Sequence, residues 1–135
     1  MRIQLALPCL ALACALLSAA ATTAARDCGH TLASVPVSIK TILQPVYASG
    51  AQGSELDAAR RQLELLMLES AHCKLSAQSM TRRSDAAEAE LAEWASLDQW
   101  LYRLVNFVEM SSKGNDSNDW KREFEIFAEV YELEL

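Results

Sequence analysis

Hydrophobic residues recur three and four positions apart along most of residues 32–131, which is the pattern of amphipathic α-helices. The most regular stretch begins at Ser54, with Asp57 in a capping-box-like position three residues later. Its inner stripe consists of Leu56, Ala59, Leu63, Leu66, Ser70, Cys73, Ala77 and Met80. This alternation of three and four is typical of helices that pack against near-antiparallel neighbours.

A shorter helix is predicted before this stretch, with Ser34 as its N-cap and Pro45 as the point where it ends or kinks. Its apolar positions are Leu32, Val35, Ile39, Ile42 or Leu43, and Val46. A glycine-containing turn at residues 49–53 follows it.

Two helices are predicted after the polar break at residues 81–84. The first begins at Asp85, and Trp100 and Phe107 widen its apolar arc of Trp94, Leu97, Leu101, Leu104, Val105 and Val108. After a polar loop at residues 111–118, the last helix is expected to run to the chain end with an aromatic arc of Trp120, Phe124, Phe127 and Tyr131. The sequence therefore predicts an all-α fold, an antiparallel four-helix bundle.

Residues 1–25 have the features of a cleaved signal peptide. Arg2 is the only charged residue before a long uncharged stretch rich in Leu and Ala, and small residues follow at 19–21 and 23–25. Two alternatives remain open, a retained membrane anchor and lipid attachment at Cys14. Cleavage would leave residues 26–135 as a single helical domain, periplasmic or secreted, without stable membrane insertion.

Cys28 and Cys73 remain after cleavage, and they are equidistant from the turn around Gly50. Residues equidistant from the turn of an antiparallel hairpin face each other, so we expect a disulfide between the start of the first helix and the second helix. A zinc site that adds His30 and His72 is the alternative. It is disfavoured because His72 and Cys73, adjacent on a helix, point about 100° apart.

Charge is distributed unevenly along the chain. The full sequence has 12 basic and 18 acidic residues, a net charge of −6, which argues against a nucleic-acid partner. Residues 26–83 hold 7 basic and 5 acidic side chains, whereas residues 84–135 hold 4 basic and 13 acidic. The acidic half predicts a protein partner with a basic surface.

The last helix carries acidic residues next to a second apolar line, apart from its aromatic arc. We predict that these residues form a partner-binding surface. They are Glu125, Ile126, Glu129, Val130, Glu132 and Leu133. Carboxylates near a helix C-terminus are electrostatically unfavourable, so a role outside folding would account for them. The alternative is a wide core-facing surface whose acids keep the protein in solution.

No catalytic motif or cofactor fingerprint is present: the chain lacks GxSxG, a glycine-rich phosphate loop and HExxH. We therefore expect that the protein uses no cofactor. We expect a non-catalytic exported binding protein that inhibits, neutralises (as immunity proteins do) or escorts a protein partner. The alternative is a carrier of a small ligand or metal, with a pocket lined by Trp94, Trp100, Phe107 and Trp120. In a eukaryotic host, Asn115 would be a glycosylation acceptor.

Overall fold

The computed structural model describes residues 28–80, 85–114 and 119–135. The expected signal peptide at residues 1–25 and the sequon at Asn115 lie outside the described residues. The described residues form four helices, α2 (Ser34–Ser49), α3 (Ser54–Met80), α4 (Asp85–Ser112) and α5 (Asp119–Val130), and contain no strand.

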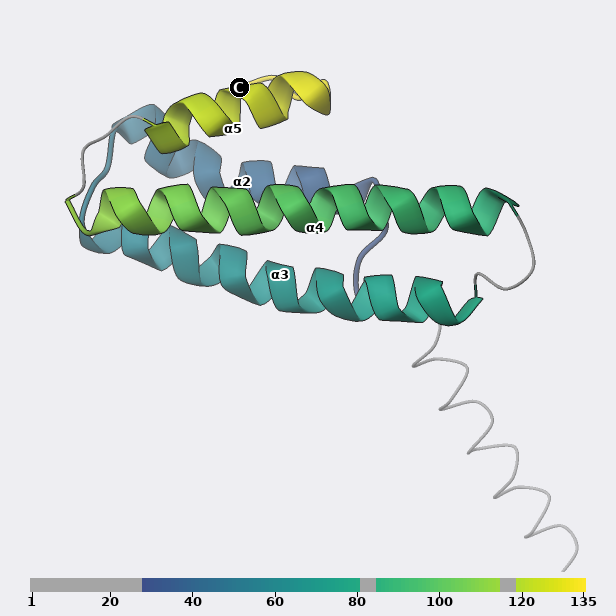
Figure 1. Cartoon of the computed structure of the whole chain (residues 1–135). Helices are drawn as coiled ribbons and strands as arrows, with labels where there is room; N and C mark the ends of the chain where they lie inside the picture. The colour runs from purple at the N-terminus through teal and green to yellow at the C-terminus, as the bar shows by residue number, and fades with distance from the viewer. Residues whose placement is uncertain (1–27, 81–84, 115–118) are drawn as a thin grey trace, which may run out of the picture.

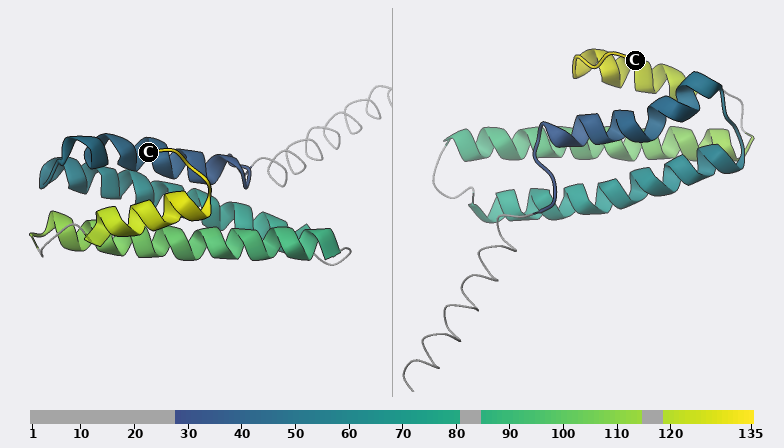
Figure 2. Two further views of the ribbon diagram at one scale, coloured as in Figure 1. Left: turned by 90° about the horizontal axis from the view of Figure 1, so that it is seen from above. Right: turned by 180° about the vertical axis from the view of Figure 1, so that it is seen from behind.

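Successive helices run in opposite directions and pack side by side, as Figure 1 shows. The most extensive contact joins α3 and α4, which have 27 and 28 residues. The shorter helices α2 and α5, of 16 and 12 residues, lie along part of this pair and touch each other (Figure 2). The prediction of an all-α antiparallel four-helix bundle is confirmed.

The core consists of the residues that the spacing places inside. From Leu56 to Cys73, the inner stripe of α3 is buried, and Ala77 packs against the core from a half-buried position. All six expected residues of α4 are buried, and α2 buries Leu43 where the sequence left Ile42 and Leu43 open. The Ser70 hydroxyl is fully buried in this core without a hydrogen-bond partner.

The two ends of α2 differ from the sequence-based expectation. Ser34 is not the N-cap: the Ser34 N–H donates to the Thr31 hydroxyl at 3.2 Å, and the Thr31 N–H donates to the Ser34 hydroxyl at 2.8 Å. This reciprocal pair caps the turn that precedes α2. Of the two outcomes expected at Pro45, the end of the helix is wrong, because α2 continues through Pro45 to Ser49. Gly50 follows as its C-cap, with a φ of 65°, the left-handed conformation that glycine adopts without a Cβ clash.

The C-terminal end of the chain also differs, because α5 ends at Val130 and does not reach the chain end. Glu132 has a φ of 55°, and the Leu133 N–H donates to the Ala128 carbonyl at 2.7 Å. Together with the bond from the Glu132 N–H to the Glu129 carbonyl, this forms a Schellman-type C-cap. Leu133 consequently turns back and packs against the core.

We predict that Glu132→Gly stabilises the protein, because a left-handed conformation costs a residue with a Cβ about 1–2 kcal/mol. Glu132→Ala is the matched control: it removes the same carboxylate but keeps the Cβ. In thermal and denaturant unfolding, the glycine variant should exceed the alanine variant by up to about 1 kcal/mol. An alanine variant at least as stable as the glycine variant would contradict the left-handed cap.

The first turns of α3 carry a network of charged side chains. Arg60 Nε donates to Asp57 Oδ1 at 3.0 Å, and Arg61 Nη2 lies 3.2 Å from Asp57 Oδ2. Asp57 therefore binds these two arginines. Its negative charge is also stabilised by the positive N-terminal end of the helix dipole. The hydrogen bond from Arg60, together with the positive charges of Arg60 and Arg61, holds the pKa of the Asp57 carboxyl below its usual value.

A carboxyl with a lowered pKa in the folded state stabilises that state above its unfolded pKa, and the stabilisation is lost as the pH falls through the folded pKa. We therefore expect Asp57→Asn to melt at a lower temperature than the wild type at neutral pH. The two melting temperatures should converge between about pH 5 and about pH 2, as measured by circular dichroism. A difference that stays constant down to acid would exclude this ionisation as its cause.

Candidate functional site

The segment before α2 is attached to α3 by the disulfide between Cys28 and Cys73. The two Cα atoms are 4.8 Å apart, within the range that the bond requires, and 45 positions separate the residues in sequence. The link joins the segment before the first helix, α2, to the second helix, α3, which agrees with the pairing predicted from the position of the turn. Cys73 is buried, whereas Cys28 is half-buried and packs against the core.

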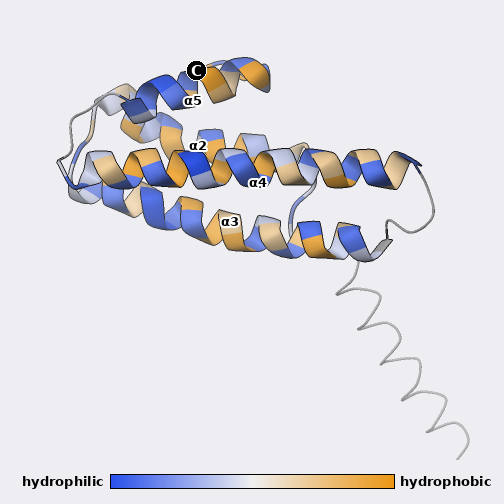
Figure 3. Ribbon diagram, in the orientation of Figure 1, coloured by the Kyte–Doolittle hydropathy of each residue, from blue (hydrophilic) through white to orange (hydrophobic). Residues whose placement is uncertain are grey.

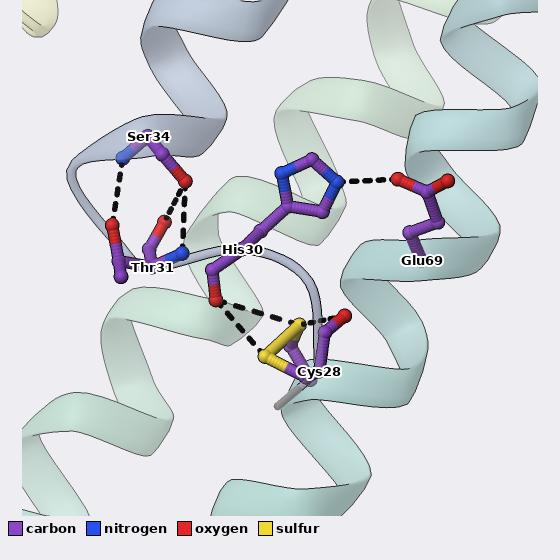
Figure 4. A network of polar contacts seen from close by, with 6 residues as sticks. Cys28, His30, Thr31, Ser34 and Glu69 are labelled. Carbon is purple, nitrogen blue, oxygen red and sulfur yellow. Dashed lines mark hydrogen bonds and ion pairs between the residues drawn. A yellow bond between two sulfur atoms is a disulfide. The ribbon is translucent and has the colours of Figure 1, made fainter. Parts of the chain in front are cut away.

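Backbone carbonyls surround the two sulfurs. The carbonyl oxygen of His30 lies 2.9 Å from Cys28 Sγ and 3.6 Å from Cys73 Sγ, and the carbonyl oxygen of Cys28 lies 3.2 Å from Cys73 Sγ (Figure 4). In the disulfide these are close contacts without a hydrogen. After reduction, the same oxygens would be acceptors for the thiols.

A second attachment lies one helical turn away on α3. His30 Nε2 and Glu69 Oε2 form a short hydrogen-bonded pair, drawn in Figure 4, so residues 28–31 contact α3 at two neighbouring points. The sequence does not reveal this pair, because the two residues are 39 positions apart.

The four proposed zinc ligands do not converge. The two cysteines bind each other, His30 faces Glu69, and His72 is exposed on α3. In the parts of the chain that the structure describes, no three His, Cys, Asp or Glu side chains are grouped so that they could hold a metal ion.

A cleft of about 500 Å³ lies between the segment before α2, the C-terminal part of α3 and the N-terminal part of α4. Its lining includes the two cysteines, Leu32, Ala77 and Trp94. The other aromatic residues expected around an internal pocket lie elsewhere: Trp120 stacks on Phe124 with ring centroids 6.4 Å apart, and Trp100 meets Phe127 edge-on at 5.6 Å. These two tryptophans and Phe107 pack in or against the core.

The outer face of α5 presents apolar and acidic residues together. Val130 is 57% exposed and Ile126 is 38% exposed, and Glu125 and Glu129 lie beside them, also exposed. Figure 3 shows hydrophilic residues at the beginning of α5 and hydrophobic residues towards its end. We call these four residues the α5 face.

The last two residues of the predicted surface are placed differently. Leu133 is half-buried against the core, and Glu132 belongs to the turn that follows the helix. Glu132 and Leu133 therefore do not continue the helical surface of Glu125 and Glu129, since the helix ends at Val130 and not at the chain end as expected. Spacing alone did not reveal that the chain turns back at this point.

An ion pair between α4 and α5 was also missed from the sequence. Arg103 Nη2 donates to Glu123 Oε1 at 3.0 Å, Arg103 Nε lies 2.6 Å from Glu123 Oε2, and Glu123 is buried. The guanidinium also lies 5.7 Å from the centre of the Trp100 ring, a cation–π contact. A helical wheel gives a signal for this pair, because Glu123 lies at the edge of the aromatic arc, one turn before Phe127.

A third missed feature is an exposed leucine stripe on α3. Leu65, Leu68 and Leu75 are 61%, 66% and 64% exposed, which exceeds the exposure of Val130 and Ile126, the apolar residues of the α5 face. Their spacing of three and seven positions could have revealed them, but the more regular inner stripe of the same helix accounts for its packing.

Comparisons of the chain with family models, with curated proteins and with solved structures found no match. Among the helices of the described residues, none combines the length and the hydropathy needed to cross a bilayer.

We expect the disulfide to contribute about 3–4 kcal/mol to the free energy of unfolding, because it closes a long loop in the unfolded chain. Reduction of the protein, or replacement of both Cys28 and Cys73 by serine, should lower the denaturation midpoint accordingly. The double variant is its own control for the reagent, since reductant should leave its midpoint unchanged. Two free thiols in the protein purified without reductant would contradict the pairing.

Proposed function

We propose that this chain is an exported, non-catalytic binding protein whose α5 face docks on a protein partner with a basic rim, inhibiting, neutralising or escorting that partner. The observation that carries the proposal is the exposure of Val130 and Ile126 beside the line of the exposed Glu125 and Glu129 on the same helix. Apolar side chains on an acidic surface are typical of sites that bind proteins with opposite charge.

The α5 face rests on a rigid support, which favours binding because little order has to be gained. Beneath it, Phe124 and Phe127 are fully buried, and Phe127 contacts Trp100 and Tyr131. The Arg103–Glu123 pair adds a polar connection from α5 to α4. A change on the outer side of α5 should therefore alter binding without unfolding the helix.

Charge in this half of the chain supports the choice of partner. Residues 84–135 hold 13 acidic and 4 basic side chains, so their field attracts a basic protein and accelerates its association. The same field would repel a nucleic acid or an anionic lipid surface. Rim charges of this kind contribute to specificity and association rate, while the apolar residues supply most of the affinity.

Export is the second part of the proposal, and it rests on the leader-like residues 1–25 and on the disulfide. A structural disulfide is typical of proteins in the periplasm or outside the cell, where thiols are oxidised. A small bundle with one cross-link suits a protein that has to remain folded in that environment.

We predict that a photo-crosslinking amino acid at position 130 yields one discrete protein adduct in the cells that make the chain. Position 37 is the matched control, since Val37 is also exposed, at 54%, but lies on α2. The adduct should weaken in high salt and in a Glu129→Lys background, because both reduce attraction to a basic rim. Electrophoresis and mass spectrometry of the adduct measure the outcome.

Stability separates loss of binding from loss of folding in this experiment. Val130→Asp and Glu129→Lys replace exposed side chains, so the free energy of unfolding should change by no more than about 0.5 kcal/mol. Equal adducts at positions 130 and 37, or no adduct at 130, would reject the α5 face as the docking surface.

A further inference from the structure

The outer surface of α3 carries a second helical stripe that the folded monomer does not use. It consists of Leu65, Leu68, His72 and Leu75, all exposed, and we call it the outer α3 stripe. The residues are three, four and three positions apart, which is the spacing of the apolar positions in coiled coils, where two helices pack along each other. A helical partner would fit this spacing better than an extended peptide.

The stripe has no cover within the described chain, because α2 and α4 pack on the other side of α3. On a helical wheel it lies roughly opposite the inner residues Leu63, Leu66 and Ser70. A groove of about 290 Å³ between α2 and α3 is lined by Leu65 together with Ile42 and Leu66. The stripe thus provides protruding side chains and a depression next to them.

The acidic residues beside the stripe already have partners within the chain. Arg60 Nη1 lies 2.6 Å from Glu64 Oε1, and Glu69 is hydrogen-bonded to His30. The sequence has a net charge of −6, so two copies repel each other over most of their surfaces. Two copies could approach through this stripe with less repulsion than through the α5 face, where Glu125 and Glu129 would meet their own counterparts.

We propose that the outer α3 stripe binds the same stripe of a second copy, forming a two-fold symmetric dimer of antiparallel α3 helices. A two-fold axis at the level of Ser70 brings together residues equidistant from it. Leu65 then meets Leu75 of the other copy, and Leu68 meets His72 of the other copy. Antiparallel packing also aligns the helix dipoles favourably.

The oligomeric state of the exported protein tests this proposal by analytical ultracentrifugation over a wide concentration range. A reversible monomer–dimer equilibrium is expected. Leu68→Glu should raise the dissociation constant at least about tenfold, since it places a carboxylate in the contact. His72→Leu should lower the constant, because it completes the apolar stripe.

Tyr102→Glu on α4 is the matched control, since Tyr102 is 64% exposed and lies outside the stripe. It should leave the dissociation constant unchanged. Circular dichroism melting of Leu68→Glu should match the wild type when both are monomeric, because Leu68 is exposed in the monomer. A photo-crosslinker at position 65 should react with the peptide that contains Leu75 of the other copy. Reaction with the peptide that contains residue 65 of the other copy would show a parallel arrangement of the two helices and would overturn the proposed register.

A protein that stays monomeric at all concentrations, or a dimer unaffected by Leu68→Glu, would overturn the proposal. So would binding of the wild type to neutral phosphatidylcholine vesicles through the same leucines without dimer formation, since the stripe would then be a lipid contact. The result is independent of the proposed α5 docking: Leu68→Glu should keep the adduct at position 130, and Val130→Asp should keep the dimer.

Discussion

The structure depends on the burial of two long apolar stripes against each other, one on α3 and one on α4. Their contact is the most extensive in the molecule, and the shorter helices α2 and α5 each pack on one of this pair and on each other. The hydrophobic effect supplies the stabilisation, since removing such side chains from water is the main favourable term in folding. Even the hydroxyl of Ser70 is enclosed without a partner, because the surrounding packing outweighs its cost.

The shorter helices need additional connections, and these differ in chemistry. The segment before α2 is joined to α3 covalently through Cys28 and Cys73 and by the contact of His30 with Glu69. In contrast, α5 is held by buried aromatic rings and by the pair of Arg103 and Glu123. Both kinds of connection fix the position of a helix while leaving its outer side accessible.

Two outer surfaces with different charge result from this architecture. The α5 face combines aliphatic side chains with carboxylates, which suits a basic partner, whereas the acids beside the outer α3 stripe are paired within the chain. Taken together, the two proposals describe a dimer with two target sites, one on each α5 face. The two proposed contacts do not compete, since the surfaces lie on different helices.

The four helices, most of their inner residues and the expected pairing of Cys28 with Cys73 could be predicted from the residues alone, because helical periodicity and the position of a turn are properties of the local sequence. The end of α5 at Val130 could not be predicted, because the left-handed turn at Glu132 depends on the packing of Leu133 against the core. Nor could the sequence show that His30 meets Glu69 or that Arg103 meets Glu123, which requires the packed arrangement of helices. Helix α3 also carries the exposed leucines Leu65, Leu68 and Leu75, and their exposure is seen only in the packed structure, because burial depends on where the neighbouring helices lie and not on the spacing within one helix.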